Sequence, residues 1–165
     1  AHTRGVLLAS PSNPTGTSIH PDELRAIHHE VSQRGGTTLI DEIYLGLSYD
    51  AQFGQSALGI DDQIISINSF SKYFNMTGWR LGWLVLPPSM TDALGKLIEF
   101  NTSCASVFVQ RAGVAAMQRA GDIVPQVVMQ MQACRDRLFV ELGSIPGLIW
   151  LSRMAGCTHF SVSLA

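Results

Sequence analysis

The chain has 165 residues, of which 46% are apolar and 15% charged, and its formal net charge is −2. This length is sufficient for one domain with a sizeable core, and the low charged fraction indicates a surface that something else partly covers. The sequence shows no clustered basic residues, which argues against binding to nucleic acid or to an anionic membrane. Its apolar stretches are far shorter than the roughly 20 residues of a membrane span.

The first part of the chain predicts a strand, a helix and a second strand. Residues 5–10 are a short apolar run that stops at the turn sequence SNPTG. Pro21 suits the first position of a helix, and the two glycines at 35–36 can end it. Residues 37–41 form the second apolar run, which ends on an acid. A strand, a helix and a strand in succession are typical of a parallel crossover unit.

The remainder predicts two more strands and three helices, followed by a break. The strands are residues 63–69 and 80–88, and the helices are residues 90–100, 106–119 and 123–143. The sequence SIPG then interrupts the helical pattern, and the strand-like runs LIWL and THFSVSL follow it. The alternation of strands and helices predicts an α/β fold with a mostly parallel sheet.

Three successive strands end in polar clusters: SNPTG at 12–16, DEIY at 41–44 and NSFSK at 68–72. Ligands of an open parallel sheet bind at the carboxyl ends of its strands, so the three clusters are expected to converge on one place. Each cluster alone also has an ordinary structural explanation. SNPTG can be a turn, Asp41 can cap the turn after its strand, and Arg80 can extend over a neighbouring tryptophan.

Together the clusters supply an acid, a phenol, an amide, hydroxyls, a lysine and an arginine at one edge of the sheet. Arg80 and the hydroxyl of Ser69 can bind a phosphate. A carboxylate such as that of Asp41 can keep a ring nitrogen protonated, and Lys72 can form a Schiff base with an aldehyde. These functional groups match the chemistry of pyridoxal 5′-phosphate.

The chain resembles the class I/II aminotransferase family, the fold-type I pyridoxal-phosphate enzymes. The resemblance is carried by SNPTG, DEIY and the stretch SFSKYFNMTGWRLGW at 69–83, which occur in the order of the family. It implies that residues 1–143 form the second half of the large, cofactor-binding domain, without its N-terminal portion. Residues 144–165 would then begin a truncated small α+β domain. We therefore expect a fragment that has little or no activity by itself.

The resemblance also implies the catalytic roles. Lys72 corresponds to the lysine that forms the Schiff base with the cofactor and then moves the proton of the substrate. Asp41 corresponds to the acid that faces the pyridine nitrogen, and Tyr44 is the third catalytic candidate.

The same resemblance implies how the cofactor is held. Asn13 and Tyr44 correspond to the pair that hydrogen-bonds the phenolic oxygen of the ring, and the Asn13–Pro14 peptide is often cis in the family. Ser69 and Arg80 correspond to phosphate ligands. Two family features have no counterpart here: the phosphate-binding loop that precedes the first strand and the aromatic residue that stacks on the ring. Arg153 lies too early to correspond to the arginine that binds the substrate carboxylate.

The activity implied is transfer of an amino group between an α-amino acid and a 2-keto acid, by a cytoplasmic homodimer in the full-length protein. Two alternatives share the same motif residues: a β-elimination lyase or synthase of this fold, and an aminotransferase-like effector domain of a transcription regulator. The histidines have no cysteine or acid at ligand spacing, so no metal site is predicted. Cys104, Cys134 and Cys157 are odd in number and scattered, which predicts reduced, buried thiols.

Overall fold

The structure is a computed structural model that describes residues 2–49, 51, 53–145, 148–151 and 161–164. Its main sheet has four strands in the order β1-β2-β3-β4. The strands are β1 (Gly5–Ala9), β2 (Thr37–Asp41), β3 (Ile65–Ser69) and β4 (Gly82–Val85). The first three are parallel, whereas β4 returns antiparallel to β3. The predicted α/β class with a mostly parallel sheet is therefore confirmed.

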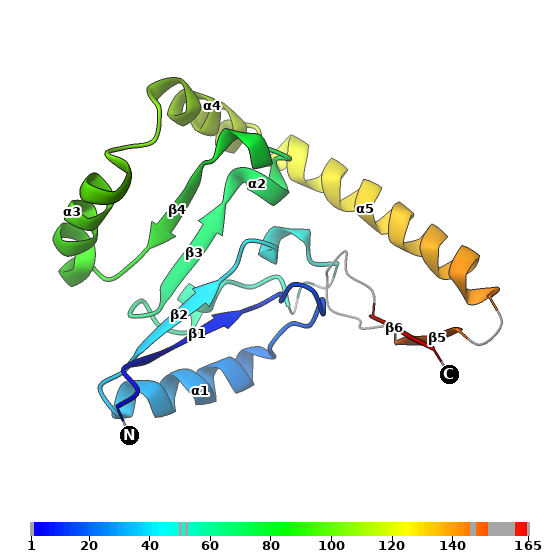
Figure 1. Ribbon diagram of the computed structural model, residues 1–165, viewed down its shortest axis with the longest axis horizontal. Helices are drawn as coiled ribbons and strands as arrows, with labels where there is room; N and C mark the ends of the chain where they lie inside the picture. The colour runs from blue at the N-terminus through cyan, green and yellow to red at the C-terminus, as the bar shows by residue number, and fades with distance from the viewer. Residues whose placement is uncertain (1, 50, 52, 146–147, 152–160, 165) are drawn as a thin grey trace.

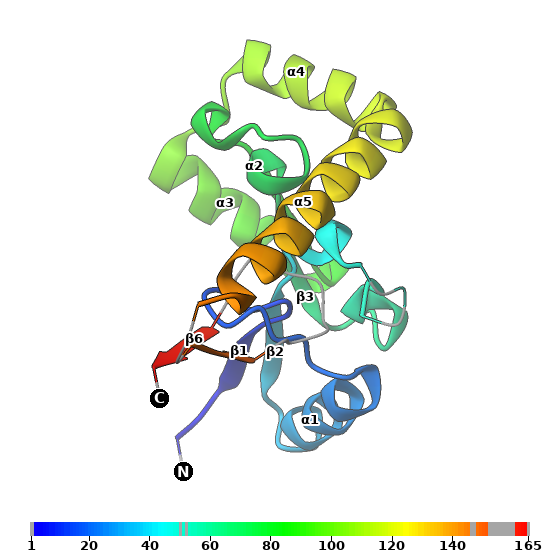
Figure 2. The ribbon, with the colours of Figure 1, turned by 90° about the vertical axis from the view of Figure 1, so that its right-hand side faces the viewer.

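The helices are α1 (Pro21–Gln33), α2 (Phe70–Tyr73), α3 (Thr91–Thr102), α4 (Val107–Gln118) and α5 (Ala120–Gly143). Helix α1 connects β1 to β2 and packs against β2, and α2 follows β3 without an intervening loop. In Figure 1 the arrowheads of β1, β2 and β3 point toward the side of the molecule along which α5 runs. Figure 2 looks onto that side and shows α5 crossing diagonally in front of the strands. Helix α5 therefore lies over the carboxyl ends of the parallel strands.

A separate antiparallel pair, β5 (Leu148–Leu151) and β6 (Ser161–Leu164), follows α5. Strand β5 coincides with the predicted run LIWL. Strand β6 is the end of the predicted run THFSVSL, whose first three residues lie outside the described part of the chain.

Several element boundaries differ from the predicted ones, and two of the starts have a clear structural consequence. The last strand of the main sheet begins at Gly82 rather than at Arg80, because Arg80 adopts a left-handed conformation with φ of 54° that a strand cannot accommodate. Helix α5 begins at Ala120 rather than at residue 123. Pro125 thus falls in its second turn rather than its first, where it removes one backbone hydrogen bond.

Three groups of buried apolar side chains hold the elements together. The first lies between α1 and the sheet and includes Leu24 and Ile40. The second joins Tyr44 and Leu47, in the turn after β2, to the side chains of α5. The third surrounds Phe70 of α2 and includes side chains from α4 and from the start of α5. The second and third groups fix α5 against the two segments that carry Tyr44 and Lys72.

Gly113 of α4 is buried where the third group is most tightly packed. A Cβ atom added there would lie 2.5 Å from Leu81 Cδ2 and 3.1 Å from Phe70 Cζ. Gly113→Ala is expected to destabilise the fold by about 1–3 kcal/mol through overpacking, although alanine favours a helix by about 1 kcal/mol. Gly95→Ala in α3, where an added Cβ meets nothing within 4 Å, is the matched control and should be stabilising. Urea unfolding of both variants measures the difference, and equal shifts of the two would contradict the packing argument.

His28 lies on the inward face of α1 and is buried. Its Nδ1 is 3.0 Å from Thr38 Oγ1 and its Nε2 is 3.2 Å from Asp61 Oδ2. A backbone N–H from Gln63 and the contact with His28 lower the pKa of the Asp61 carboxyl. Both ring nitrogens thus have polar partners, which makes His28 a hydrogen-bonded core residue.

The prediction of buried cysteines is wrong for the two that the structure describes. Cys104 and Cys134 are free and exposed. Cys104 lies in the loop between α3 and α4, and Cys134 lies on α5, in the lining of a cavity that Lys72 also borders. Cys157 lies outside the described residues.

Candidate active site

Residues from the three polar clusters meet at the carboxyl ends of the parallel strands. Asn13 Nδ2 donates a hydrogen bond to Tyr44 Oη over 3.3 Å. Lys72 Nζ lies 5.6 Å from the centre of the Tyr44 ring. The Tyr44 side chain is only 8% exposed, Lys72 is half-buried and Asn13 is exposed. An amide, a phenol and an amine from three distant segments therefore share one site.

Asn13 is presented by a tight loop directly after β1. The Ser12 N–H donates to the Thr17 carbonyl and the Gly16 N–H donates to the Ser12 carbonyl, each over 2.8 Å. Gly16 has a φ of 66°, a left-handed conformation that glycine adopts without steric cost. The Asn13–Pro14 peptide bond is cis, as expected from the resemblance. The loop returns on itself and leaves the Asn13 amide next to Tyr44.

Asp41 ends the central strand β2, where it is paired in register with Ala9 of β1 and Ile67 of β3. Its side chain is half-buried, and its Oδ1 accepts a hydrogen bond from the Ile43 N–H over 3.0 Å. The turn-capping role left open by the sequence is thus present in the structure. One carboxylate oxygen fixes the turn, while the group as a whole remains at the edge of the sheet between the SNPTG loop and α2.

Ser69, Ser71 and Arg80 line a hollow of ≈ 230 Å³ together with Leu81 and Gly82. Ser69 Oγ accepts the Ser71 N–H over 3.0 Å and lies 2.9 Å from Ser71 Oγ. The Arg80 guanidinium is exposed and donates to the Thr77 carbonyl over 2.9 Å. Two hydroxyls and a guanidinium at one small hollow are suited to hold a phosphate.

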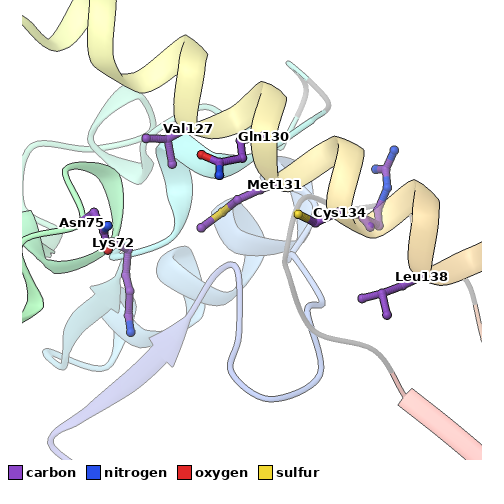
Figure 3. A pocket seen from close by; sticks show the side chains of 8 residues that line it. Lys72, Asn75, Val127, Gln130, Met131, Cys134 and Leu138 are labelled. Atoms are coloured by element: carbon purple, nitrogen blue, oxygen red, sulfur yellow. The ribbon is translucent and has the colours of Figure 1, made fainter.

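A second and larger cavity, of ≈ 350 Å³, lies between Lys72 and α5. In Figure 3 the Met131 side chain extends from α5 toward that of Lys72, and Gln130 and Cys134 project from the same helix. The sequence identified none of these α5 residues as part of a site, because helical spacing shows which residues share a face but not which element lies opposite. Arg135, at the wall of this cavity, stacks on Tyr49 at 4.3 Å and pairs with Asp136 at 2.7 Å.

The donor set fits a phosphorylated pyridine aldehyde. A lysine amine, a carboxylate, an amide–phenol pair and a phosphate-binding hollow are the four kinds of group that pyridoxal 5′-phosphate uses in proteins. The observed Asn13–Tyr44 hydrogen bond and the hollow between Ser69 and Arg80 are the two geometric features in favour. Among the described residues, no group of three histidine, cysteine or acidic side chains is placed to hold a metal ion. None of the described helices is long and apolar enough to cross a membrane.

Tyr73, the neighbour of Lys72, has a phenol whose ionisation is linked to folding. Burial raises the pKa of Tyr73 to about 12 from its ordinary value of 10.0, and the Glu42 and Asp41 carboxylates add to the shift. Since the folded chain keeps this proton after the unfolded chain has lost it, the stabilisation is complete below pH 10 and is lost as the pH rises toward about 12. Urea unfolding over this range should give a shallower loss of stability for Tyr73→Phe than for the unsubstituted chain. An equal loss would contradict the shifted pKa.

Comparison with known proteins gives a consistent result. The family model described as "Aminotransferase class I and II" matches residues 1–162. The chain is 44% identical over 114 residues to the valine–pyruvate aminotransferase of Mycobacterium tuberculosis. The matched stretch is 68% of this chain and 29% of that protein. It is 31% identical over 149 residues to an aspartate aminotransferase of Musicola paradisiaca, with 88% of the chain and 37% of that protein covered. The chain thus spans between 29% and 39% of the length of the curated relatives it matches.

Solved structures show the same relationship at the level of the fold. The crystal structure of an aminotransferase from Mycobacterium tuberculosis matches with a TM-score of 0.80 at 35% identity, over 93% of this chain and 40% of that one. An aminotransferase structure from Silicibacter pomeroyi, described as putative, matches with a TM-score of 0.81 at 32% identity. The observed sheet and helices are therefore part of the fold-type I aminotransferase architecture.

Proposed function

Because the chain belongs to the class I and II aminotransferase family, we propose that it carries the cofactor-binding part of an enzyme that moves an amino group between an α-amino acid and a 2-keto acid. One observation supports this most directly. The side chains of Asn13, Tyr44 and Lys72 come from three separate family motifs. Asn13 Nδ2 lies 3.3 Å from Tyr44 Oη, and Lys72 Nζ lies 5.6 Å from the centre of the Tyr44 ring.

Bound pyridoxal 5′-phosphate supplies an aldehyde that bonds to amines and a protonated ring that withdraws electrons from the Cα–H bond of an amino acid. The Lys72 amine would anchor the cofactor, and its Nζ, as a free amine, would take up the Cα proton of the substrate. Asp41 keeps the ring nitrogen protonated by placing a negative charge beside it. Lys72 would thus move the proton, and Asp41 would hold the ring in its protonated form.

The other site residues orient the cofactor. The Asn13 amide and the Tyr44 hydroxyl, which contact one another, would hold the phenolic oxygen of the ring. The hydroxyls of Ser69 and Ser71 and the Arg80 guanidinium bind the phosphate in the hollow that they line. The buried Tyr44 ring, packed against α5, excludes water beside the lysine amine. This arrangement divides the site into a reactive end at Lys72 and an anionic end at Arg80.

We place residues 1–143 in the large domain and residues 144–165 at the start of a small domain, since α5 ends at Gly143 and a separate strand pair follows. We also propose that the protein acts as a homodimer in the cytoplasm. Exposed apolar side chains on α3 and α4, such as Phe100 at 88% and Phe108 at 70% exposure, support a surface covered by a second copy. The relatives described above carry aminotransferase names, so neither a lyase nor a regulator domain is favoured.

The chain offers a direct test, because Lys72 and Lys96 are its only lysines. Incubation with limiting pyridoxal 5′-phosphate, reduction with borohydride and peptide mapping should place the phosphopyridoxyl group on Lys72. Lys96, in exposed α3, serves as the internal reference. In parallel, the product of the complete open reading frame should convert an amino acid into its keto acid. Equal labelling of the two lysines would contradict the proposed site.

A further inference from the structure

Glu42 is a charged residue in the core of the sheet, immediately after Asp41. Its side chain is only 2% exposed. Glu42 Oε1 accepts the Ala57 N–H over 2.7 Å, and Oε2 accepts the hydroxyls of Ser56 and Ser66 over 2.8 and 2.5 Å. Three donors to one carboxylate make its burial tolerable, because a buried charge without partners is strongly destabilising. These bonds fix the end of β2 to β3 and to the segment around residue 57.

The backbone of Glu42 has a second partner from α2. Tyr73 Oη donates to the Glu42 carbonyl over 2.8 Å, across 31 positions of sequence. The Tyr73 ring packs over Gly46, where an added Cβ would lie 3.1 Å from Tyr73 Cζ. A larger residue at position 46 would therefore require the ring to shift by a few tenths of an ångström. The phenol thus joins the helix that carries Lys72 to the turn that carries Tyr44.

Residues therefore alternate in role along both segments. Asp41 and Lys72 face the candidate site, and their neighbours Glu42 and Tyr73 contact each other instead. Asp41 and Lys72 are far apart in the sequence, and a long connection from residue 45 to residue 64 lies between them. The local backbone therefore does not fix the position of one relative to the other. A direct contact between the two neighbours supplies that means.

We propose that Glu42 and Tyr73 are positioning residues, and that the hydrogen bond between them, the Glu42–Tyr73 link, holds the Lys72 amine in register with Asp41 and Tyr44. This inference rests on the proposed function of Lys72. The three hydrogen bonds of its carboxylate hold Glu42 in place, so its backbone carbonyl is a well-positioned acceptor. The hydrogen bond from Tyr73 to this carbonyl in turn holds α2 in place. Neither residue is assigned a contact with substrate or cofactor.

The first test measures the ratio of Lys72 to Lys96 labelling by pyridoxal 5′-phosphate and borohydride. Tyr73→Phe keeps the ring over Gly46 and removes only the donor, so the ratio should fall about fivefold, the loss expected for one hydrogen bond of about 1 kcal/mol. Tyr49→Phe removes a phenol outside the link and should leave the ratio unchanged. If Tyr73 only stabilised the fold, Tyr73→Phe would lower the stability of the chain but leave the ratio of Lys72 to Lys96 labelling unchanged.

Glu42 is tested with a pair of variants. Glu42→Gln keeps an acceptor for the Ala57 N–H, and its amide can donate to the two serine hydroxyls, which accept as well as donate. It should retain the labelling ratio. Glu42→Leu removes all three partners and should lower the ratio at least as far as Tyr73→Phe. A ratio unaffected in folded Tyr73→Phe and Glu42→Leu would overturn the proposal.

A second measurement separates failure of the link from failure of the proposed function. Hydrogen exchange without cofactor should become faster in Tyr73→Phe at the amides of Leu45 and Leu47, which donate to the Glu42 and Tyr44 carbonyls over 2.9 Å each. The amide of Leu24, in α1, should be unaffected. Unchanged exchange at Leu45 and Leu47 would overturn the link. Equal labelling of Lys72 and Lys96 in the unsubstituted chain, with exchange altered as expected, would instead overturn the assignment of Lys72.

Discussion

Lys72→Ala is expected to lower amino-group transfer by the product of the complete open reading frame at least about 10³-fold. The variant loses both the covalent anchor for the cofactor and the base that moves the substrate proton. The fold should be retained, because Lys72 lies at the wall of the ≈ 350 Å³ cavity and supports no buried hydrogen bond that the structure shows. Steady-state keto acid formation measures the loss.

Lys96→Ala is the matched control, since it removes the other lysine of this chain from an exposed position on α3. Its activity should stay within about twofold of the unsubstituted protein, because Lys96 lies outside the candidate site. Borohydride reduction should also fail to attach the cofactor to Lys72→Ala in this segment. Full activity in Lys72→Ala, or selective labelling of Lys96 in the unsubstituted chain, would contradict the assigned role.

The sequence allowed the parallel part of the fold to be predicted well, because its strands are short apolar runs that end in turn residues. β1, β2 and β3 all lie within one or two residues of the predicted runs. The antiparallel direction of β4 could not be obtained in this way. It depends on the left-handed conformation of Arg80 and the close approach of Gly82 to the Asn68 carbonyl, which are tertiary features rather than local preferences.

The meeting of the three motif clusters was also predictable, since it follows from parallel topology alone. The contacts within the site were not. Asn13 and Tyr44 were expected to share a ligand, whereas the structure joins them directly. The sequence did not single out Glu42. It lies between the end of an apolar run and Ile43, and a buried acid there is an unusual core residue. Its three partners come from two other segments, so no local pattern could reveal them.

Helix α5 shows the clearest limit of pattern analysis. Its apolar side chains recur at steps of three and four, which predicts a helix, yet Val128 and Met131 are half-buried while Leu138 and Cys134 are exposed. The helix packs on the turn after β2 and on α2 along its first half, and its second half extends past them. Periodicity reports which side chains share a face, but the extent of burial depends on the length of the surface opposite.

The effect of the Asp41 charge can be separated from its structural contact by Asp41→Asn. Asparagine retains a side-chain oxygen that can accept the Ile43 N–H, so the turn after β2 should keep its conformation. The negative charge beside the cofactor ring nitrogen is lost, and with it the stabilisation of the protonated ring. Activity of the product of the complete open reading frame is therefore expected to fall about 10²–10⁴-fold, the range typical of impaired proton transfer from the substrate.

Three measurements together decide whether this loss arises from charge. Thermal unfolding of Asp41→Asn should match that of the unsubstituted chain, because the capping contact persists. Selective labelling of Lys72 over Lys96 should also persist, since the phosphate is held by Ser69, Ser71 and Arg80 at the far end of the site. Asp62→Asn, which alters an exposed acid outside the site, should keep full activity. If Asp41→Asn lost Lys72 labelling as well as activity, Asp41 would be a residue that positions the cofactor. If Asp41→Asn kept full activity, Asp41 would not be a catalytic residue.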